Sequence, residues 1–511
     1  MRSALLFALW FFLAVTPAWG DEHDASDKKM EVEAEPRSST TRHSIRIDGE
    51  TVEYDATVGW LIMKNDQDEP IARFGYTAYT RRGFDDPGER PIMFAFNGGP
   101  GSSSIWLHMG ILGPQRVVVN DAGFAPPPPA RRVDNEYSII DVTDLVMVDP
   151  VGTGFSKPLG EADGKELFWG VDQDIKSVGA FIKQYITENA RWASPKYILG
   201  ESYGGIRSAG LVHHLQSRHG MHFNGVIVVS PFLSMGSGID GASIDLPHML
   251  YLSTFAATAW YHDALDDKPD NLEAFVAEVD EFAFTEYAAA LLKGYTIPRA
   301  EKEAVAGKLA RYTGTSADYW IKADLRVGHQ QFLQELQRDN RIVTGRIDSR
   351  FLGPAVNPLG EAMDYDPFFP SVGPAFTAGF LDYLHNELDF GKDETYQVSA
   401  FGAVGSNWDW KHQPPSGSGW AVPWADLRPD LAMAMTTNPG LHLLVQQGYY
   451  DMATPIGATR FDIAHLDIPA EARDRIVMAY YEAGHMMYLH QPSLEKFRED
   501  LAAFVRETDR L

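Results

Sequence analysis

The chain has 511 residues, 44% of them hydrophobic, which is enough to bury a large core and excludes a disordered protein. Lys and Arg number 44 against 70 Asp and Glu, and the resulting net charge of -26 opposes binding to nucleic acid through the general field of the protein. The sequence has no cysteine, which excludes thiol catalysis, thiolate metal sites and disulfides.

The first twenty residues are typical of a secretory signal. Arg2 gives a short basic start, residues 5–15 form an apolar run, and Ala18-Trp19-Gly20 offers a cleavage site between small residues. A membrane anchor is the alternative, but the run is short for a bilayer and acidic residues follow it at once. We expect cleavage after Gly20, a periplasmic or secreted protein without stable membrane insertion, and a flexible leader over residues 21–43.

The next part of the chain alternates between strand and helix patterns. From residue 44 to about residue 82, short alternating segments predict antiparallel strands at a sheet edge. Compact apolar runs then predict four buried strands, at residues 91–96, 144–148, 195–199 and 226–229. Helical spacing of apolar residues predicts helices over 175–186 and 206–215. Strands alternating with helices indicate a mostly parallel, doubly wound sheet, the α/β class.

A long insertion interrupts this pattern. Residues 240–430 include helical stretches at 272–292 and 317–338, without clear strand-helix-strand units. The pattern resumes with strands at 441–445 and 475–480 and a final helix at 493–507. We therefore predict one catalytic domain, residues 44–239 and 431–511, that carries a largely helical cap insertion over residues 240–430.

The segment Gly200-Glu201-Ser202-Tyr203-Gly204 fits the G-x-S-x-G pattern of a nucleophile elbow. In such an elbow a serine sits on a sharp turn from a strand to a helix, and the glycines permit that turn. Here a predicted strand precedes the segment and a predicted helix follows it. The alternative is an ordinary strand-helix turn, but this context favours Ser202 as a nucleophile in an α/β-hydrolase fold.

A serine nucleophile needs a base to accept its proton and an acid to orient that base. In α/β-hydrolases the chain order is Ser, then Asp or Glu, then His, each on a loop beyond a strand. Asp451 follows the strand at 441–445, and His485 follows the strand at 475–480. The rival acids and bases lie less directly at a strand exit: Asp462, Asp467, His465 and His490.

An oxyanion hole completes this machinery. One donor is normally the backbone N–H after the nucleophile, here that of Tyr203, and the other comes from a glycine-rich loop after an early strand. The loop Asn97-Gly98-Gly99-Pro100-Gly101 follows the strand at 91–96, and Gly99 is the predicted donor. Without the elbow, a plain tight turn would be the better interpretation of this loop.

These motifs together resemble the serine carboxypeptidase family, in the form of a bacterial-type secreted member. The resemblance rests on residues 96–104, 149–156, 200–205 and 484–486 and on the loop of Asp451, and it spans roughly residues 45–235 and 435–511. It implies removal of the C-terminal residue of a peptide through an acyl-enzyme, with no metal or organic cofactor. The expected partners are peptides with a free C-terminus; the sequence leaves the oligomeric state open.

The resemblance also implies a site for the terminal carboxylate of the substrate. In this family the matching positions are Asn97, with the N–H of Gly98, and Glu201. A glutamate can hydrogen-bond a carboxylate only when it carries a proton, which would explain adaptation to acidic pH.

The chain departs from the family pattern in two places, and two alternative functions stay open. Ser102 stands where a cysteine is common, and Lys157 where members often have tyrosine, so we expect the cap and a neighbouring subsite to differ. The alternatives are an esterase or acyltransferase with the same triad, and a secreted binding protein that has lost activity. Intact Ser202, Asp451 and His485 argue against the second, and Asn97 with Glu201 favours peptides over neutral esters.

Overall fold

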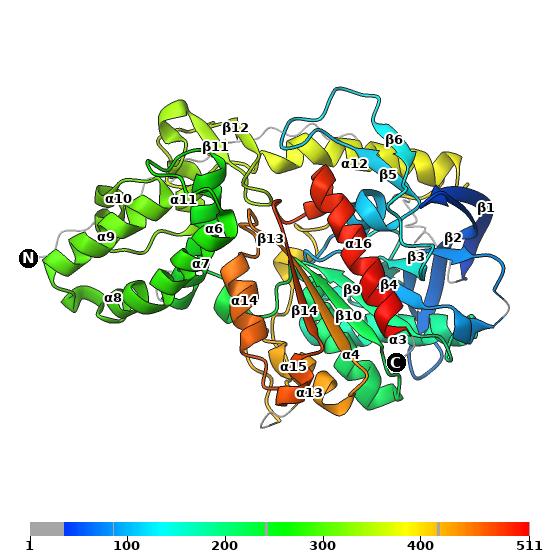
Figure 1. Cartoon of the computed structure of the whole chain (residues 1–511). Helices are drawn as coiled ribbons and strands as arrows, with labels where there is room; N and C mark the ends of the chain where they lie inside the picture. Colours follow the sequence, from blue (N-terminus) through cyan, green and yellow to red (C-terminus); the bar gives the residue numbers. More distant parts are fainter. Residues whose placement is uncertain (1–34, 85, 241–243, 416–418, 510–511) are drawn as a thin grey trace, which may run out of the picture. The chain divides into compact units, whose positions relative to one another are not determined.

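The computed structural model describes residues 35–84, 86–240, 244–415 and 419–509, and a ten-stranded sheet lies at its centre (Figure 1). The predicted signal over residues 1–20 and most of the predicted leader fall outside these ranges. None of the helices within them is long and apolar enough to cross a bilayer.

The sheet is antiparallel at one edge and parallel elsewhere. Its strand order is β1-β2-β3-β7-β4-β9-β10-β13-β14, with the short β8 (Lys157–Pro158) pairing with β3. The antiparallel strands come first in the chain: β1 Arg37–Ile47, β2 Glu50–Lys64 and β3 Pro70–Arg81. From β7 onward each neighbouring pair is parallel: β7 Asp144–Val148, β4 Ile92–Phe96, β9 Lys196–Glu201, β10 Gly225–Val229, β13 His442–Gly448 and β14 Ile476–Tyr481. The predicted mostly parallel α/β sheet is confirmed.

The central strands are apolar along their whole length because both faces of the sheet are covered. In β4 every residue is buried, and successive side chains enter opposite cores. Met93 packs on the side of α12 (Phe368–Asn386) and α16 (Gln491–Thr508), whereas Phe94 packs on the other side. That second core includes α3 (Val171–Glu188) and α4 (Gly204–His219). This layering explains why compact apolar runs in the sequence located the strands.

The first strand begins earlier than the sequence pattern indicates. Residues 37–43, assigned to the flexible leader, form the start of β1 and pair with β2 from Arg37 opposite Trp60 onward. Their side chains are polar and alternate between half-buried and exposed positions, so the hydropathy carries no strand signal. Backbone pairing with a long neighbour holds this segment, and the leader prediction is corrected to end before Arg37.

The predicted cap is narrower than residues 240–430. A separate helical core is formed by α6 Leu246–Tyr261, α7 Leu272–Phe282, α8 Ala288–Leu292, α9 Arg299–Thr313, α10 Ala317–Lys322 and α11 His329–Glu335. The predicted helix over 317–338 is broken between α10 and α11, where Asp324 and Leu325 have φ values of 50° and 66°. Helix α12, in contrast, packs into the core of the catalytic domain through Phe376 and Phe380, so this part of the insertion belongs to that domain.

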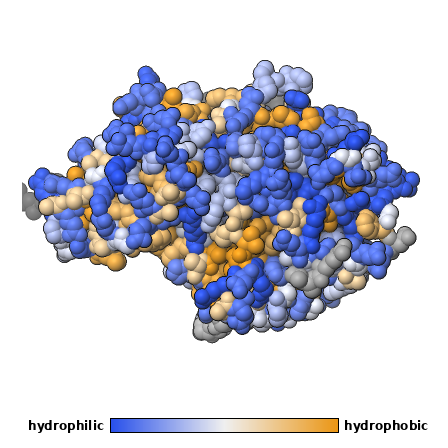
Figure 2. All heavy atoms as spheres, viewed as in Figure 1, coloured by the Kyte–Doolittle hydropathy of each residue, from blue (hydrophilic) through white to orange (hydrophobic). Residues whose placement is uncertain are grey.

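The outer strand β14 has a neighbour on one side only. On the face shown in Figure 2, hydrophobic side chains gather over the position of β14, and Val477 of this strand is 48% exposed. The active-site residues lie at the carboxyl ends of the parallel strands, where α/β sheets bind their ligands, and His485 follows β14 itself.

Candidate active site

The nucleophile elbow has the expected geometry. Ser202 follows β9 directly, precedes α4 and has a φ of +63°, a strained value that the surrounding hydrogen bonds maintain. Its N–H donates to Val229 O (3.0 Å), and its carbonyl accepts from Gly205 N (2.8 Å) and Phe232 N (3.0 Å). A Cβ at Gly200 would lie 2.2 Å from Gly204 O, which is why the turn requires glycine there.

Asp451 and His485 meet on neighbouring loops at the ends of β13 and β14. The Nδ1 atom of His485 lies 2.8 Å from Asp451 Oδ2. The other oxygen of Asp451 accepts from the backbone N–H groups of Ala453 (2.8 Å) and Thr454 (2.9 Å), and the Thr454 hydroxyl donates to Oδ2 (2.7 Å). The carboxylate is therefore fixed toward the imidazole, as the acid of a triad must be.

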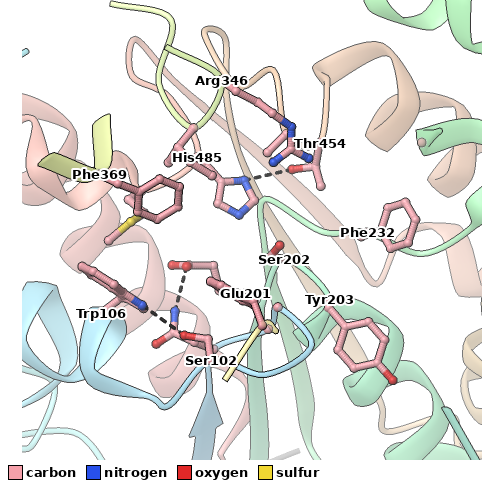
Figure 3. A pocket seen from close by; sticks show the side chains of 18 of the residues that line it. Ser102, Trp106, Glu201, Ser202, Tyr203, Phe232, Arg346, Phe369, Thr454 and His485 are labelled. Atoms are coloured by element: carbon pink, nitrogen blue, oxygen red, sulfur yellow. Dashed lines mark hydrogen bonds between the residues drawn. The ribbon is translucent and has the colours of Figure 1, made fainter. Parts of the chain in front are cut away.

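The remaining nitrogen of His485 is on the side of Ser202 (Figure 3). Within the described ranges no hydrogen bond joins the Ser202 hydroxyl to His485. Catalytic hydrogen bonds often tighten only when substrate binds. Burial alone would lower the pKa of His485, but the adjacent Asp451 and Glu201 raise it above its ordinary value.

None of the four rival acids and bases lines the active-site cavity, and three of them have other partners. Asp462 accepts from the Ser237 hydroxyl (2.8 Å) and lies 3.3 Å from Arg428. His465 contacts the carbonyl of Phe461, and His490 contacts the hydroxyl of Ser493. The structure thus brings together the residues that the sequence favoured and leaves the rivals outside.

The glycine loop lies directly against the elbow. A Cβ at Gly98 would lie 2.5 Å from Tyr203 N and 2.7 Å from Glu201 O, so only glycine allows this approach. Among the described residues, none accepts a hydrogen bond from the backbone N–H of Gly99 or of Tyr203. Both residues line the cavity beside Ser202, which makes these groups available to an oxyanion.

A buried carboxyl group lies beside the nucleophile. Glu201 is 3% exposed; its Oε1 accepts from Asn97 Nδ2 (2.7 Å) and its Oε2 from the Tyr488 hydroxyl (2.8 Å). The N–H of Leu107 donates to Asn97 Oδ1 (3.1 Å), which turns the amide nitrogen of Asn97 toward Glu201. Burial raises the pKa of Glu201 to about 7, against the opposing effects of His485, Tyr488 and Asn97.

These groups surround a cavity of about 460 Å³, in the range of small-ligand sites (Figure 3). Every predicted site residue lines it except Asp451, which is fully buried. The apolar part of the wall is mostly aromatic: Trp106, Phe232, Phe369, Phe401 and Trp410. The cavity can therefore hold an apolar side chain next to a small set of polar groups.

Three features of the site are absent from the sequence prediction. Tyr488 follows His485 by three residues and donates to Glu201, and Thr454 braces Asp451. Residues 346–347 come from the insertion: Ile347 O accepts from His485 N (2.8 Å), and Arg346 O accepts from Met452 N (3.1 Å).

Of the two departures from the family pattern, Ser102 lies at the site and Lys157 does not. The Ser102 hydroxyl donates to Ser103 O (2.9 Å), and the loop pairs by backbone bonds with residues 398–400, so hydrogen bonds hold the insertion here. Lys157 does not line the cavity; its Nζ lies 3.8 Å from Glu394. The expected change of a neighbouring subsite through Lys157 is therefore not supported.

Comparison with known families gives a match over residues 50–281 to the family described as serine carboxypeptidase. Serine carboxypeptidase-like 10 of Arabidopsis thaliana is 24% identical over 176 residues, 32% of this chain and 37% of that protein. Pheromone-processing carboxypeptidase KEX1 of Saccharomyces cerevisiae is 31% identical over 147 residues, 28% of this chain and 19% of that protein. The chain thus matches well under half the length of these relatives, and the predicted family resemblance is confirmed.

The fold has a counterpart among solved structures. The prohormone-processing carboxypeptidase KEX1(delta)p from Saccharomyces cerevisiae superposes with a TM-score of 0.52 at 15% identity, covering 93% of this chain and 92% of that one. At this identity the similarity concerns the fold alone. It confirms the α/β-hydrolase architecture.

We predict that Gly98→Ala disables the site without unfolding the protein. The new Cβ meets three backbone atoms of the elbow, so the nucleophile must move, and a shift of about 1 Å costs on the order of 10²-fold in rate. Turnover of p-nitrophenyl acetate and the thermal midpoint measure the two effects. The control is Gly307→Ala in α9, where nothing lies within 4 Å. Wild-type turnover in Gly98→Ala would contradict the described contact.

Proposed function

From the match of residues 50–281 to the serine carboxypeptidase family, we propose that this protein is a serine-type carboxypeptidase that removes the C-terminal residue of peptides through an acyl-enzyme. Ser202 attacks the carbonyl of the last peptide bond, and His485 accepts the hydroxyl proton. Asp451 keeps the imidazole in the required tautomer and stabilises its cation. The N–H groups of Gly99 and Tyr203 bind the oxyanion of the tetrahedral intermediate.

The second half of the reaction reverses the proton transfers. The imidazolium of His485 gives its proton to the leaving amino group, which releases the C-terminal amino acid and leaves the acyl group on Ser202. Water then attacks this ester while His485 again accepts a proton, and collapse of the intermediate frees Ser202. The chain's own side chains and backbone supply each proton acceptor and donor in this scheme.

The single observation that carries the proposal is the buried carboxyl of Glu201 beside the nucleophile. A free C-terminal carboxylate can approach Glu201 only when Glu201 is protonated, and burial raises its pKa to about 7. The amide nitrogen of Asn97 donates one N–H to Glu201 and has a second N–H for the same carboxylate. The bond from Leu107 N–H to the amide oxygen fixes this orientation. A neutral ester needs neither group, so this arrangement favours a free-acid peptide.

The proposed mechanism sets two opposing limits on pH. Glu201 must be protonated to bind the substrate carboxylate, and it loses this proton as pH rises through about 7. His485 must be neutral to act as a base, so activity should be lost as pH falls through its raised pKa and the imidazole takes up a proton. We therefore expect a bell-shaped profile whose alkaline limb falls near pH 7 and whose acidic limb follows His485.

Location in the periplasm or outside the cell belongs to the same proposal. It is supported by the basic start, apolar run and small residues at the N-terminus of the sequence. The mass of the exported protein should correspond to a chain that starts near Asp21. An exported, membrane-bound chain that retains Met1 would favour an anchor instead.

Loss of the nucleophile tests the acyl-enzyme. Ser202→Ala should lose about 10⁴-fold or more in kcat, and an organophosphonate should label the wild-type protein on Ser202. Peptide mapping by mass spectrometry identifies the labelled residue. Substantial peptide turnover by Ser202→Ala would exclude the mechanism.

Glu201→Gln tests the carboxylate site. The amide keeps a donor and an acceptor but does not ionise, so KM for a free-acid peptide should stay level from pH 5 to pH 8. In the wild type KM should rise above about pH 7, because the ionised Glu201 repels the substrate. The measurement is KM against pH for both proteins on one blocked dipeptide.

Two controls sharpen this experiment. Tyr488→Phe removes a donor that stabilises the ionised carboxyl, so the pKa of Glu201 should increase and the rise in KM should move to higher pH. An amidated substrate lacks the carboxylate, so its KM should change little with pH. Identical KM profiles for wild type and Glu201→Gln would remove Glu201 from the carboxylate site.

A further inference from the structure

Arg346 places a cation in the wall of the active-site cavity. It is half-buried and lines the cavity together with Ser202 and His485. In the described part of the chain its guanidinium makes no ion pair and no side-chain hydrogen bond. Arginine has a planar fork of donors that matches a carboxylate. Acidic side chains outnumber basic ones in this chain, so an arginine without an ion pair is notable. A free guanidinium here is therefore available to a ligand.

The backbone around Arg346 is fixed by both catalytic loops. Its carbonyl accepts from Met452 N, next to Asp451, and Ile347 O accepts from the N–H of His485. On the other side, Asp366 Oδ2 accepts from Ile347 N (3.0 Å). This segment of the insertion is therefore held at a defined place over the reacting groups.

Arg346 lies at the end of the cavity opposite the proposed carboxylate site. Figure 3 shows its guanidinium on the Thr454 side of His485, away from Trp106, Phe369 and Glu201. The guanidinium also interacts with the phenol of Tyr251, whose hydroxyl donates to Gly238 O (3.2 Å), and Gly238 lines this end of the cavity. With the C-terminal residue held near Glu201, this end faces the acyl part of the substrate.

The acid that interacts electrostatically with Arg346 is Asp366, which, among the described residues, forms no ion pair with the guanidinium. Both oxygens of Asp366 accept backbone N–H bonds, from Ile347 and from Phe368, each at 3.0 Å. The other nearby acids pair elsewhere: Asp348 with Arg350 (2.6 Å), Asp240 with His329 (3.0 Å) and Asp451 with His485 (2.8 Å). The further titratable groups near Arg346 are the Tyr251 phenol and the imidazole of His485, whose pKa the guanidinium lowers; Glu201 lies at the opposite end.

We infer that Arg346 makes the enzyme selective for an acidic residue, Asp or Glu, directly before the bond that is cleaved. Its guanidinium would pair with the side-chain carboxylate of that residue while Asn97 and Glu201 hold the terminal one. This inference rests on the proposed carboxypeptidase function. It adds a substrate class: peptides whose penultimate residue is acidic.

The test compares blocked dipeptides that differ only in this residue. With benzoyl-Glu-Phe and benzoyl-Gln-Phe at pH 5.5 to 6, wild-type kcat/KM should favour Glu by about tenfold or more, the effect of one charge-assisted contact. Arg346→Met keeps the length of the side chain without its charge, and its Glu-to-Gln ratio should fall to near one. Arg346→Lys should retain part of the preference, because the charge remains without the fork.

Three controls separate this role from a general effect on the site. Arg299→Met, on the surface of α9, should keep the wild-type ratio. Benzoyl-Phe-Glu and benzoyl-Phe-Gln carry the acid at the C-terminal position and should be cleaved without a comparable preference. The Glu-to-Gln ratio should also decrease as pH falls through about 4, where the glutamate side chain takes up a proton.

The outcomes distinguish this inference from the proposed function. Cleavage of both peptides with a ratio of one, or an unchanged ratio in Arg346→Met, would overturn the role of Arg346 and leave the carboxypeptidase intact. A preference only at the C-terminal position would overturn the assignment to the acyl side. Hydrolysis of p-nitrophenyl acetate without cleavage of any free-acid peptide would overturn the proposed function and this inference with it.

Discussion

The site depends on one constraint: a buried carboxyl group, Glu201, has to be satisfied next to a nucleophile. Three elements meet to do this, because Asn97 comes from the loop after β4, Glu201 from the end of β9, and Tyr488 from the turn that follows His485. A buried polar group that lost one of these partners would be costly. The network therefore fixes the glycine loop, the elbow and the histidine loop relative to one another.

The insertion contributes to the site as well as covering it. Residues 346–347 hydrogen-bond to both the Asp451 loop and the His485 loop, and residues 398–400 pair with the glycine loop. Around position 102 the hydrogen bonds of Ser102 and its neighbours hold the glycine loop to the insertion. The cavity wall and the catalytic loops are thus parts of one hydrogen-bonded structure, and substrate selectivity can arise from the insertion.

The central sheet and the reacting groups could be predicted from the sequence because their signals are local. The apolar strand of β4, the glycines around Ser202, and the strand-exit positions of Asp451 and His485 each follow from short patterns. The start of β1 could not be predicted, because its residues are polar and backbone pairing with β2 holds them. The extent of the cap could not be predicted either, because hydropathy does not show which core a helix such as α12 packs against. Tyr488 and Arg346 also escaped prediction, because only the folded chain brings them to Glu201 and Ser202.

The most direct test of the central claim compares the products formed from one peptide with a free C-terminus and from the same peptide with an amidated C-terminus. We expect mass spectrometry to show stepwise loss of residues from the C-terminus of a free-acid peptide at pH 6. The same peptide with an amidated C-terminus should stay largely intact, because it has no carboxylate for Asn97 and protonated Glu201. Equal cleavage of the two forms, or cleavage at internal bonds, would contradict the account.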